Sequence, residues 1–256
     1  MASQYLSVFV RNALEENEEL LQDVLTGRAD TETLLTFCEN FRRAGIGALF
    51  LGSAPKLFRQ MLHYSGRAYA HFLGRAGPRT VLTSKANPFF DAVGAGDFDA
   101  AALIAHTSRR DWGQGEEYEE DFLFVEFLMQ RFFLGATPQA GAALLERYEA
   151  SLQGAEDCRL PMCHALLTRD SQAFNSTLTT FLSERDEWLT QLSDGGAVSD
   201  ESAATEGNLC VPGLALVKLA ERDGLETEQD YLHVPSTARK GGLIAFAPDA
   251  WRALWD

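Results

Sequence analysis

Apolar residues recur at spacings of three and four along most of the chain, which is the pattern of helices with one buried face. The first such segment covers 7–25 and is followed by Gly27, a residue type that ends helices in the left-handed conformation. A second helix is expected to start at Asp30, whose carboxylate can accept the free amide protons of the first turn, and to end at Gly45. A third follows a break at 52–53. The pattern predicts an all-α protein.

Two later segments share one layout. In each, a proline opens a short helix, and nine residues after it an aspartate can cap a second helix. The pairs are Pro88 with Asp97 and Pro161 with Asp170. This layout predicts a helix-turn-helix hairpin that is used twice. Helical hairpins can stack into superhelices, so we expect an all-α fold of stacked helical hairpins in a tetratricopeptide-like superhelical bundle.

Residues 116–134 are expected to form an amphipathic helix between the two hairpins. Its stretch 122–134 is apolar nearly all round, as a central buried helix is. The polar stretch 193–207 is rich in Gly, Ser and acidic residues and is expected to be a long exposed loop. We predict a single all-helical domain over residues 1–256, with a possible sub-boundary near 74–86.

The net charge is −15, from 37 acidic and 22 basic residues. A field of this sign repels nucleic acid and anionic membranes, and it speeds the encounter with a basic protein by about 10-fold to 1000-fold in favourable cases. Solubility alone explains the charge equally well. The composition therefore argues against nucleic acid or a membrane as partner and is compatible with a basic protein.

The start of the chain has no basic stretch followed by a long apolar run, and no segment approaches the roughly 18 apolar residues that a membrane-spanning helix needs. We therefore expect a cytoplasmic protein. Its four cysteines lie in or beside apolar runs, where Cys behaves as a small buried hydrophobe. They are expected to be reduced thiols.

Candidate catalytic and metal motifs are incomplete. The run Gly-Ala-Gly-Asp at 94–97 has the first two glycines of a dinucleotide loop but lacks the third, so the turn of a helical hairpin explains it better. Cys158, Cys163 and His164 suggest a metal site, yet no second ligand pair stands at zinc spacing. The sequence has no Walker loop, serine elbow or His-Glu-x-x-His motif. We predict no catalytic, cofactor-binding or metal-binding residues.

The acidic run 116–121 allows three interpretations. Carboxylates in a first helical turn complement the helix dipole, which is worth about 0.3–1 kcal/mol per charge. The second interpretation is a surface that pairs with Lys and Arg of a partner. The third, acid–base catalysis by paired carboxylates, ranks last because no nucleophile or base neighbours the run.

Four segments follow one another along the chain: PFFDAVGAGDFDAAALI at 88–104, EYEEDFLFVEFL at 117–128, ALLTRD at 165–170 and GLALVKLAERDGL at 213–225. Trp112 and Trp188 lie between them, and Tyr231-Leu232 follows. This colinear series resembles the immunity protein 49 family of bacterial polymorphic toxin systems. The resemblance implies a cytoplasmic antidote that binds a cognate toxin and protects the producer or its siblings from an effector delivered between cells.

The resemblance and the charge together lead us to expect an immunity protein that neutralises its toxin by tight stoichiometric binding, with an acidic surface facing a basic, nucleic-acid-acting toxin domain. Two other functions stay open: a helical-repeat scaffold without a toxin partner and, less favoured, an enzyme that uses the carboxylates of 117–121. The candidate partner-binding residues are all acidic: Glu116, Glu117, Glu119, Glu120, Asp121, Asp194, Asp200, Glu201 and Glu206.

Overall fold

The computed structural model describes residues 4–77, 81–239 and 246–253. Within these ranges the secondary structure consists of twelve α-helices and two short 3₁₀ helices, with no strand. The all-α prediction is confirmed, whereas the superhelical arrangement stays a prediction. Within the same ranges, no helix has both the length and the hydropathy that crossing a bilayer requires.

The helices have these bounds: α1 Leu6–Thr26, α2 Thr31–Gly52, α3 Pro55–Ala76, α4 Asn87–Ala95, α5 Phe98–Thr107, α6 Glu119–Phe132, α7 Pro138–Leu152, α8 Arg159–Thr168, α9 Ser171–Asp194, α10 Asp200–Ala204, α11 Val211–Arg222 and α12 Ser236–Arg239. The 3₁₀ helices are η1, Thr83–Lys85, and η2, Ala250–Arg252.

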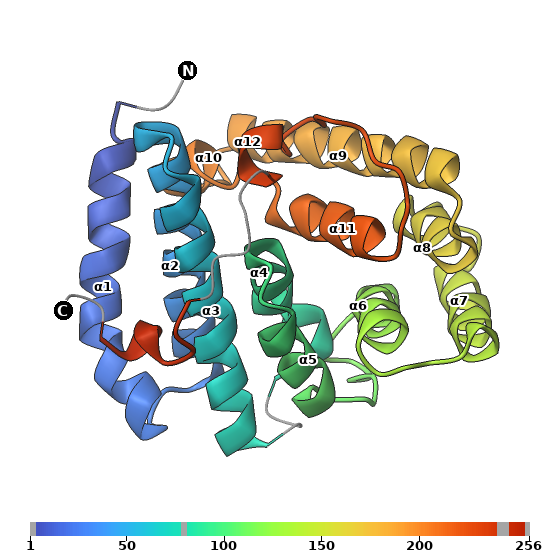
Figure 1. Ribbon diagram of the computed structural model, residues 1–256, viewed down its shortest axis with the longest axis horizontal. Helices are drawn as coiled ribbons and strands as arrows, with labels where there is room; N and C mark the ends of the chain where they lie inside the picture. Colours follow the sequence, from blue (N-terminus) through green and yellow to red (C-terminus); the bar gives the residue numbers. More distant parts are fainter. Residues whose placement is uncertain (1–3, 78–80, 240–245, 254–256) are drawn as a thin grey trace.

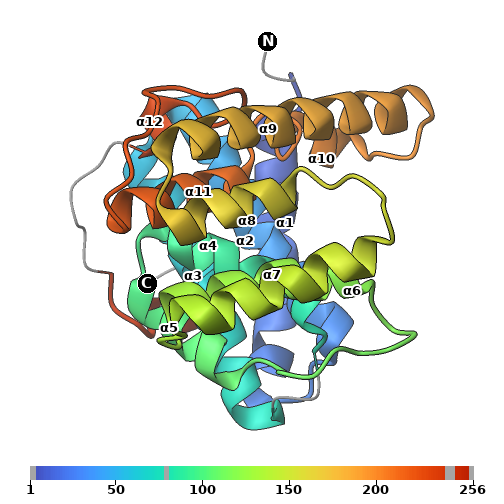
Figure 2. The same cartoon turned by 90° about the vertical axis from the view of Figure 1, so that its right-hand side faces the viewer.

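The first three helices lie side by side along one flank of the molecule (Figure 1). In the middle, α4 packs against both α3 and α11, so residues from distant parts of the sequence share its surroundings. On the other flank, α6, α7, α8 and α9 follow one another as packed neighbours (Figures 1 and 2). One continuous apolar core joins residues from both flanks. The predicted single domain stays a prediction, and its possible boundary at 74–86 includes residues 78–80, which lie outside the described ranges.

Both predicted hairpins are present. In the α4–α5 hairpin, Gly96 adopts a left-handed φ of 81°, and the Asp97 side chain accepts a hydrogen bond from the Ala100 amide at 3.0 Å. In the α8–α9 hairpin, Arg169 takes the left-handed position with φ 59°, and Asp170 accepts from the Ala173 amide at 3.0 Å. The same capping chemistry therefore ends one helix and starts the next in both copies.

The predicted end of the second helix at Gly45 is wrong, because α2 continues to Gly52. The glycines inside α2 serve close packing instead. A Cβ on Gly45 would lie 3.0 Å from the Met61 Cβ, and one on Gly47 would lie 2.1 Å from a methyl carbon of Val10. Tertiary contacts with α1 and α3 thus override the weak helix propensity of glycine. The predicted break at 52–53 is confirmed.

Buried side-chain amides connect α1 to α2. Asn17 on α1 is fully buried and donates to the Phe37 carbonyl oxygen at 3.0 Å. Asn40 on α2, also buried, donates to the Asn17 side-chain oxygen at 3.1 Å. Because a buried amide without a partner costs about 1–3 kcal/mol, each asparagine depends on the other helix being in place.

Two other expectations need correction. The helix expected over 116–134 begins only at Glu119, since 116–118 form part of a turn, although its residues 122–129 are all buried as predicted. The expected loop 193–207 is interrupted by α10, which Ser199 caps by accepting from the Ser202 amide at 3.2 Å. Residues 193–200 are largely exposed, whereas Ala204 and Thr205 are buried.

Gly66 on α3 provides a test of the helix packing. A Cβ there would lie 2.7 Å from the Ala92 Cβ and 3.0 Å from its Cα on α4. We expect Gly66→Ala to lower the free energy of unfolding by about 1–3 kcal/mol through overpacking. Gly74→Ala on the same helix, where nothing lies within 4 Å, is the control and should be neutral or stabilise by up to about 1 kcal/mol. Urea denaturation measures both, and equal effects of the two substitutions would contradict the packing interpretation.

Candidate partner-binding surface

The acidic residues predicted around the start of α6, which we call the α6 cluster, are Glu116, Glu117, Glu119, Glu120 and Asp121. Three of them occupy the first turn of the helix, where they complement its dipole. The other two precede the helix in a turn that contains an isolated bridge between Gln114 and Glu117. The cluster is therefore split between a helix terminus and a turn.

Glu117 has a structural role. One of its carboxylate oxygens accepts a hydrogen bond from the Gly113 amide at 3.0 Å, and the other accepts from the Ser84 amide at 2.9 Å. Its backbone carbonyl oxygen also accepts from the Trp112 indole at 3.0 Å. These contacts fasten the turn before α6 to η1, so this carboxylate is occupied inside the protein.

Three other members of the cluster form ion pairs within the chain. The shortest nitrogen–oxygen distances are 3.3 Å for Glu116 with Arg109, 2.6 Å for Glu119 with Arg147 and 2.7 Å for Asp121 with Arg159. Glu120 alone in the cluster has no ion pair or hydrogen bond to its side chain within the described residues. These pairs lie at the surface, with Glu116 exposed and Glu119 and Asp121 half-buried. Surface pairs contribute about 0–1 kcal/mol each, so a partner's basic groups could replace these arginines at small cost.

The acids of 193–207 divide in the same way. Asp194 and Asp200 are exposed and make no ion pair within the described ranges. Glu201 lies 3.8 Å from Arg43, and Glu206 lies 3.3 Å from Arg42. Within the described part of the chain, no hydrogen bond or ion pair joins these acids to the α6 cluster directly. In both segments, therefore, only some of the predicted carboxylates are without a partner within the described residues.

Glu206 belongs to a buried charge network that the sequence did not predict. Arg42 on α2 donates to both carboxylate oxygens of Asp91 on α4, at 2.7 and 2.8 Å. The Ser65 hydroxyl of α3 donates to the same carboxylate at 2.5 Å. Burial raises the pKa of Asp91, although Arg42 and Ser65 oppose the shift. The sequence does contain one signal for this network, because the charged residue Arg42 directly follows Phe41 among apolar positions of the expected second helix. Nothing in the sequence identifies Asp91 as its partner.

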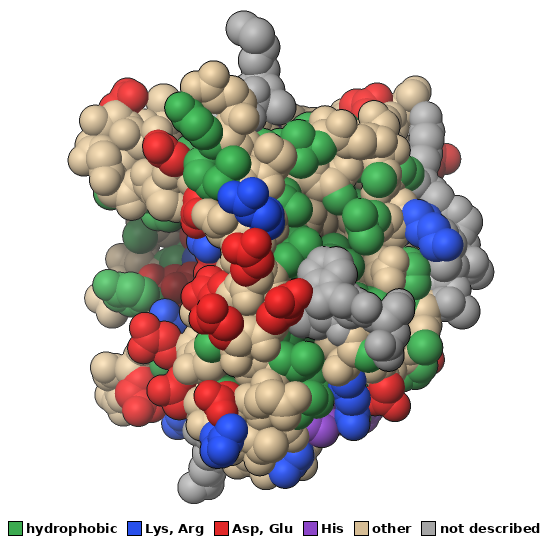
Figure 3. Space-filling view, turned by 90° about the vertical axis from the view of Figure 1, so that its left-hand side faces the viewer, with side chains coloured by type: hydrophobic (Ala, Val, Ile, Leu, Met, Phe, Trp, Pro, Cys, Tyr) green, Lys and Arg blue, Asp and Glu red, His purple; other side chains and the backbone are tan. Residues whose placement is uncertain are grey.

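Sequence reasoning also missed the acids of α1. Glu15, Glu16, Glu18 and Glu19 are exposed on this helix, and acidic side chains gather in the middle of the face that α1 borders (Figure 3). Glu15 lies 3.7 Å from Arg11, and Glu16 accepts a hydrogen bond from Asn40 at 2.8 Å. The run Glu-Glu-Asn-Glu-Glu at 15–19 was a visible signal for this acidic face.

Groups that could hold a metal are not assembled in the described part of the chain, where no cluster of three or more His, Cys, Asp or Glu has suitable geometry. All four cysteines are unpaired, and three of them are buried. Burial raises the pKa of the Cys210 and Cys38 thiols, which keeps them neutral and unreactive.

The fold and this surface define an acidic, all-helical protein whose charges partly hold its own helices together and partly remain free at the surface. The family model Immunity protein 49 matches residues 37–238, and the chain belongs to this family. The match confirms the resemblance seen in the sequence and extends it from residue 88 towards the N-terminus as far as residue 37. Membership indicates a non-catalytic inhibitor role and implies a cognate toxin as partner. Neither the comparison with curated proteins nor that with solved structures finds a match.

Asp157 allows a test of how the paired acids contribute to stability. Burial would raise the pKa of this carboxyl, but the Arg159 guanidinium and amide and the Tyr148 hydroxyl outweigh burial and hold the pKa below its usual range. A carboxyl with a lowered folded pKa stabilises above its unfolded pKa, near 3.8, and loses that contribution as the pH falls through the folded value. We expect Asp157→Asn to cost about 1–2 kcal/mol at pH 7, with the difference from wild type narrowing as the pH falls below the unfolded pKa near 3.8.

Urea denaturation at pH 7 and at acid pH measures this difference. Glu156→Gln, which changes an exposed neighbour without an ion pair in the described ranges, is the control and should have little effect at either pH. A cost at Asp157 that is the same at both pH values would show that shape, and not charge, is responsible.

Proposed function

We propose that this protein is an immunity protein that neutralises a cognate secreted bacterial toxin by binding it stoichiometrically in the cytoplasm. The observation that carries the proposal is the family match over residues 37–238. The net charge of −15 supports a basic partner, because oppositely charged surfaces steer association and fix orientation. Toxin domains that act on nucleic acid need basic substrate clefts, and an acidic protein is complementary to such a cleft.

The partner surface that we propose includes the members of the predicted set that form no ion pair or side-chain hydrogen bond within the described residues, which are Glu120, Asp194 and Asp200. These residues can bind Lys or Arg of a toxin without first leaving an internal partner. The paired members, such as Glu119 and Asp121, could contribute by exchanging an arginine of this chain for a basic group of the toxin. A specific interface of ordinary size buries about 1,600 Å² in total, which requires more than these side chains alone.

The proposal is tested with the product of the gene next to the one that encodes this chain. We expect that protein to be toxic when produced alone, to lose its toxicity when this chain is produced with it, and to co-purify with it at one-to-one stoichiometry. A neighbouring gene of housekeeping function, together with no protection of cells, would instead favour a scaffold without a toxin. A metal-dependent turnover by this chain that is lost when the carboxylates of 117–121 are neutralised would favour an enzyme.

The free acids provide a second test. We expect the triple variant Glu120→Gln, Asp194→Asn and Asp200→Asn to bind the toxin about 2-fold to 10-fold more weakly and with a smaller dependence on salt, while its thermal stability stays near that of wild type. Calorimetric titration at two salt concentrations measures the effect. Glu117→Gln is the contrasting variant, because loss of its contacts with Gly113 and Ser84 should lower stability more than affinity. Unchanged affinity and salt dependence in the triple variant would remove these residues from the interface.

A further inference from the structure

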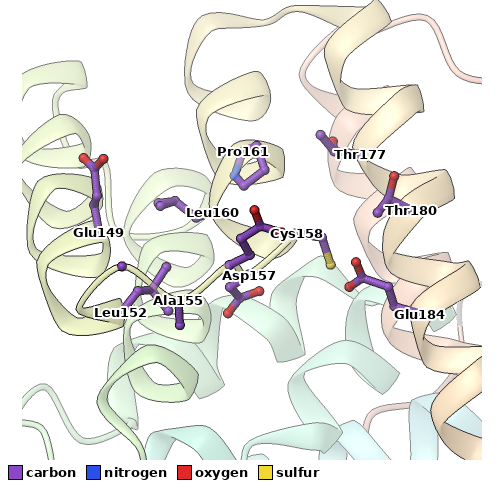
Figure 4. A pocket seen from close by; sticks show the side chains of 12 residues that line it. Glu149, Leu152, Ala155, Asp157, Cys158, Leu160, Pro161, Thr177, Thr180 and Glu184 are labelled. Carbon is purple, nitrogen blue, oxygen red and sulfur yellow. The ribbon is translucent and has the colours of Figure 1, made fainter.

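A cavity of about 600 Å³ opens between α7, α8 and α9. Its lining belongs to the end of α7, the connection to α8, the first turn of α8 and one face of α9 (Figure 4). Much of the wall is aliphatic and comes from Leu152, Ala155, Leu160 and Pro161. The cavity can therefore hold an apolar group of side-chain size.

The polar part of the lining is negative. Among the described lining residues, none is Lys or Arg, and four are acidic: Glu149, Glu156, Asp157 and Glu184. Figure 4 shows Glu149 on α7 and Glu184 on α9 on opposite sides of the cavity, with Asp157 between them. Asp157 is bound by Arg159 and Tyr148, whereas the other three acids are exposed and form no ion pair in the described ranges. Their charge is available to a ligand.

The helix termini at the cavity are compatible with a positively charged ligand. The carboxyl end of α7, at Leu152, contributes a partial negative charge that favours a cation. The amino end of α8 would oppose it, but the Asp157 carboxylate lies at that end and accepts a hydrogen bond from the Arg159 amide at 2.9 Å. Arg159 itself is shared between Asp157 and Asp121, at 2.7 Å from each. The electrostatic field in the cavity therefore comes mainly from the three glutamates without an ion pair, Glu149, Glu156 and Glu184.

Cys158 shows that the cavity is not arranged for covalent chemistry. Burial and a hydrogen bond to Glu184 raise the pKa of this thiol to about 12, so it stays protonated at neutral pH. A protonated thiol is a poor nucleophile and a poor metal ligand. In Figure 4 its sulfur lies on the side of Glu184, which is consistent with the thiol holding that carboxylate in place.

The face of α9 that carries Glu184 continues to an exposed tryptophan. Trp188 follows Glu184 by one helical turn, is 58% exposed, and lines a second cavity of about 640 Å³ formed mainly by the end of α9, the segment through α10 and the start of α11. The end of α9 and α10 lie at the right edge in Figure 2, and the opposite view in Figure 3 shows a hollow with acidic side chains at the corresponding left edge. The interface residues that contribute most of the binding energy are enriched in Trp and cluster at pockets, which fits an exposed Trp beside a cavity.

We propose that the cavity between α7, α8 and α9 receives a Lys or Arg side chain of the toxin, and that Trp188 packs against the segment of the toxin that flanks this side chain. The inference rests on the proposed function. The aliphatic stem of the basic residue lies on Leu152 and Leu160, and its charged end reaches the glutamates at the rim. An acidic rim over an aliphatic wall matches both parts of such a side chain, whereas the rim repels the carboxylate of an acidic side chain.

The test compares binding of the neighbouring gene's toxin to four forms of the full chain. The cavity variant carries Glu149→Gln, Glu156→Gln and Glu184→Gln, and a second variant, Ala155→Trp, fills the cavity without changing its charge. The control carries Glu32→Gln, Asp99→Asn and Glu228→Gln, three exposed acids without ion pairs in the described ranges, and so removes the same charge elsewhere. We expect both cavity variants to bind about tenfold or more weakly than wild type and the control to change by less than about twofold.

Each outcome bears on the proposal. Equal weakening by the cavity variant and the control, with no effect of Ala155→Trp, would mean that only overall charge matters, which overturns the cavity site and leaves the immunity function intact. No binding of the toxin to wild type would overturn both. A change in the oligomeric state of the protein alone, caused by Ala155→Trp, would assign the cavity to a second copy of this chain and overturn the proposal. Thermal melting of all variants confirms that they are folded.

Discussion

One buried carboxylate, Asp91, connects three helices. Asp91 belongs to α4. Its carboxylate accepts hydrogen bonds from two nitrogens of the Arg42 guanidinium on α2 and from the Ser65 hydroxyl on α3. Removing one partner of a buried ion pair costs about 3–5 kcal/mol, because the remaining charge has no solvent. The distances between α2, α3 and α4 are thus constrained by charge as well as by packing. Since α4 also packs against α11, the helix that carries this carboxylate connects α11 to α3.

The helices themselves could be predicted largely from local signals. Asp30, Asp97 and Asp170 each cap a helix as their position in the sequence indicates, because capping involves only the next three residues. Gly45 shows where local reasoning fails. Its neighbours in sequence suggest a helix end, whereas its neighbours in space, Phe58 and Met61, require a residue without a side chain inside a helix. Contacts of this kind depend on tertiary placement, which one sequence does not give.

The same limit applies to the charges. The acidic residues are visible in the sequence, but their partners are not: Arg147 is 28 residues from Glu119, and Arg42 is 164 residues from Glu206. Sequence reasoning therefore treated as one surface acids that the fold separates into structural and free groups. It also could not find the cavity beside α9, since its acids come from two helices and the connection between α7 and α8 and are not consecutive.

The contact between α1 and α2 crosses the N-terminal limit of the family match. Residue 37, where the match begins, lies inside α2, and the bond from Asn17 to the Phe37 carbonyl oxygen comes from a helix outside the matched range. A fragment trimmed to 37–238 would therefore start partway along a helix, would expose the face of α2 that α1 covers, and would leave Asn40 without its amide partner. In this chain the matched range is narrower than the set of helices that pack against one another.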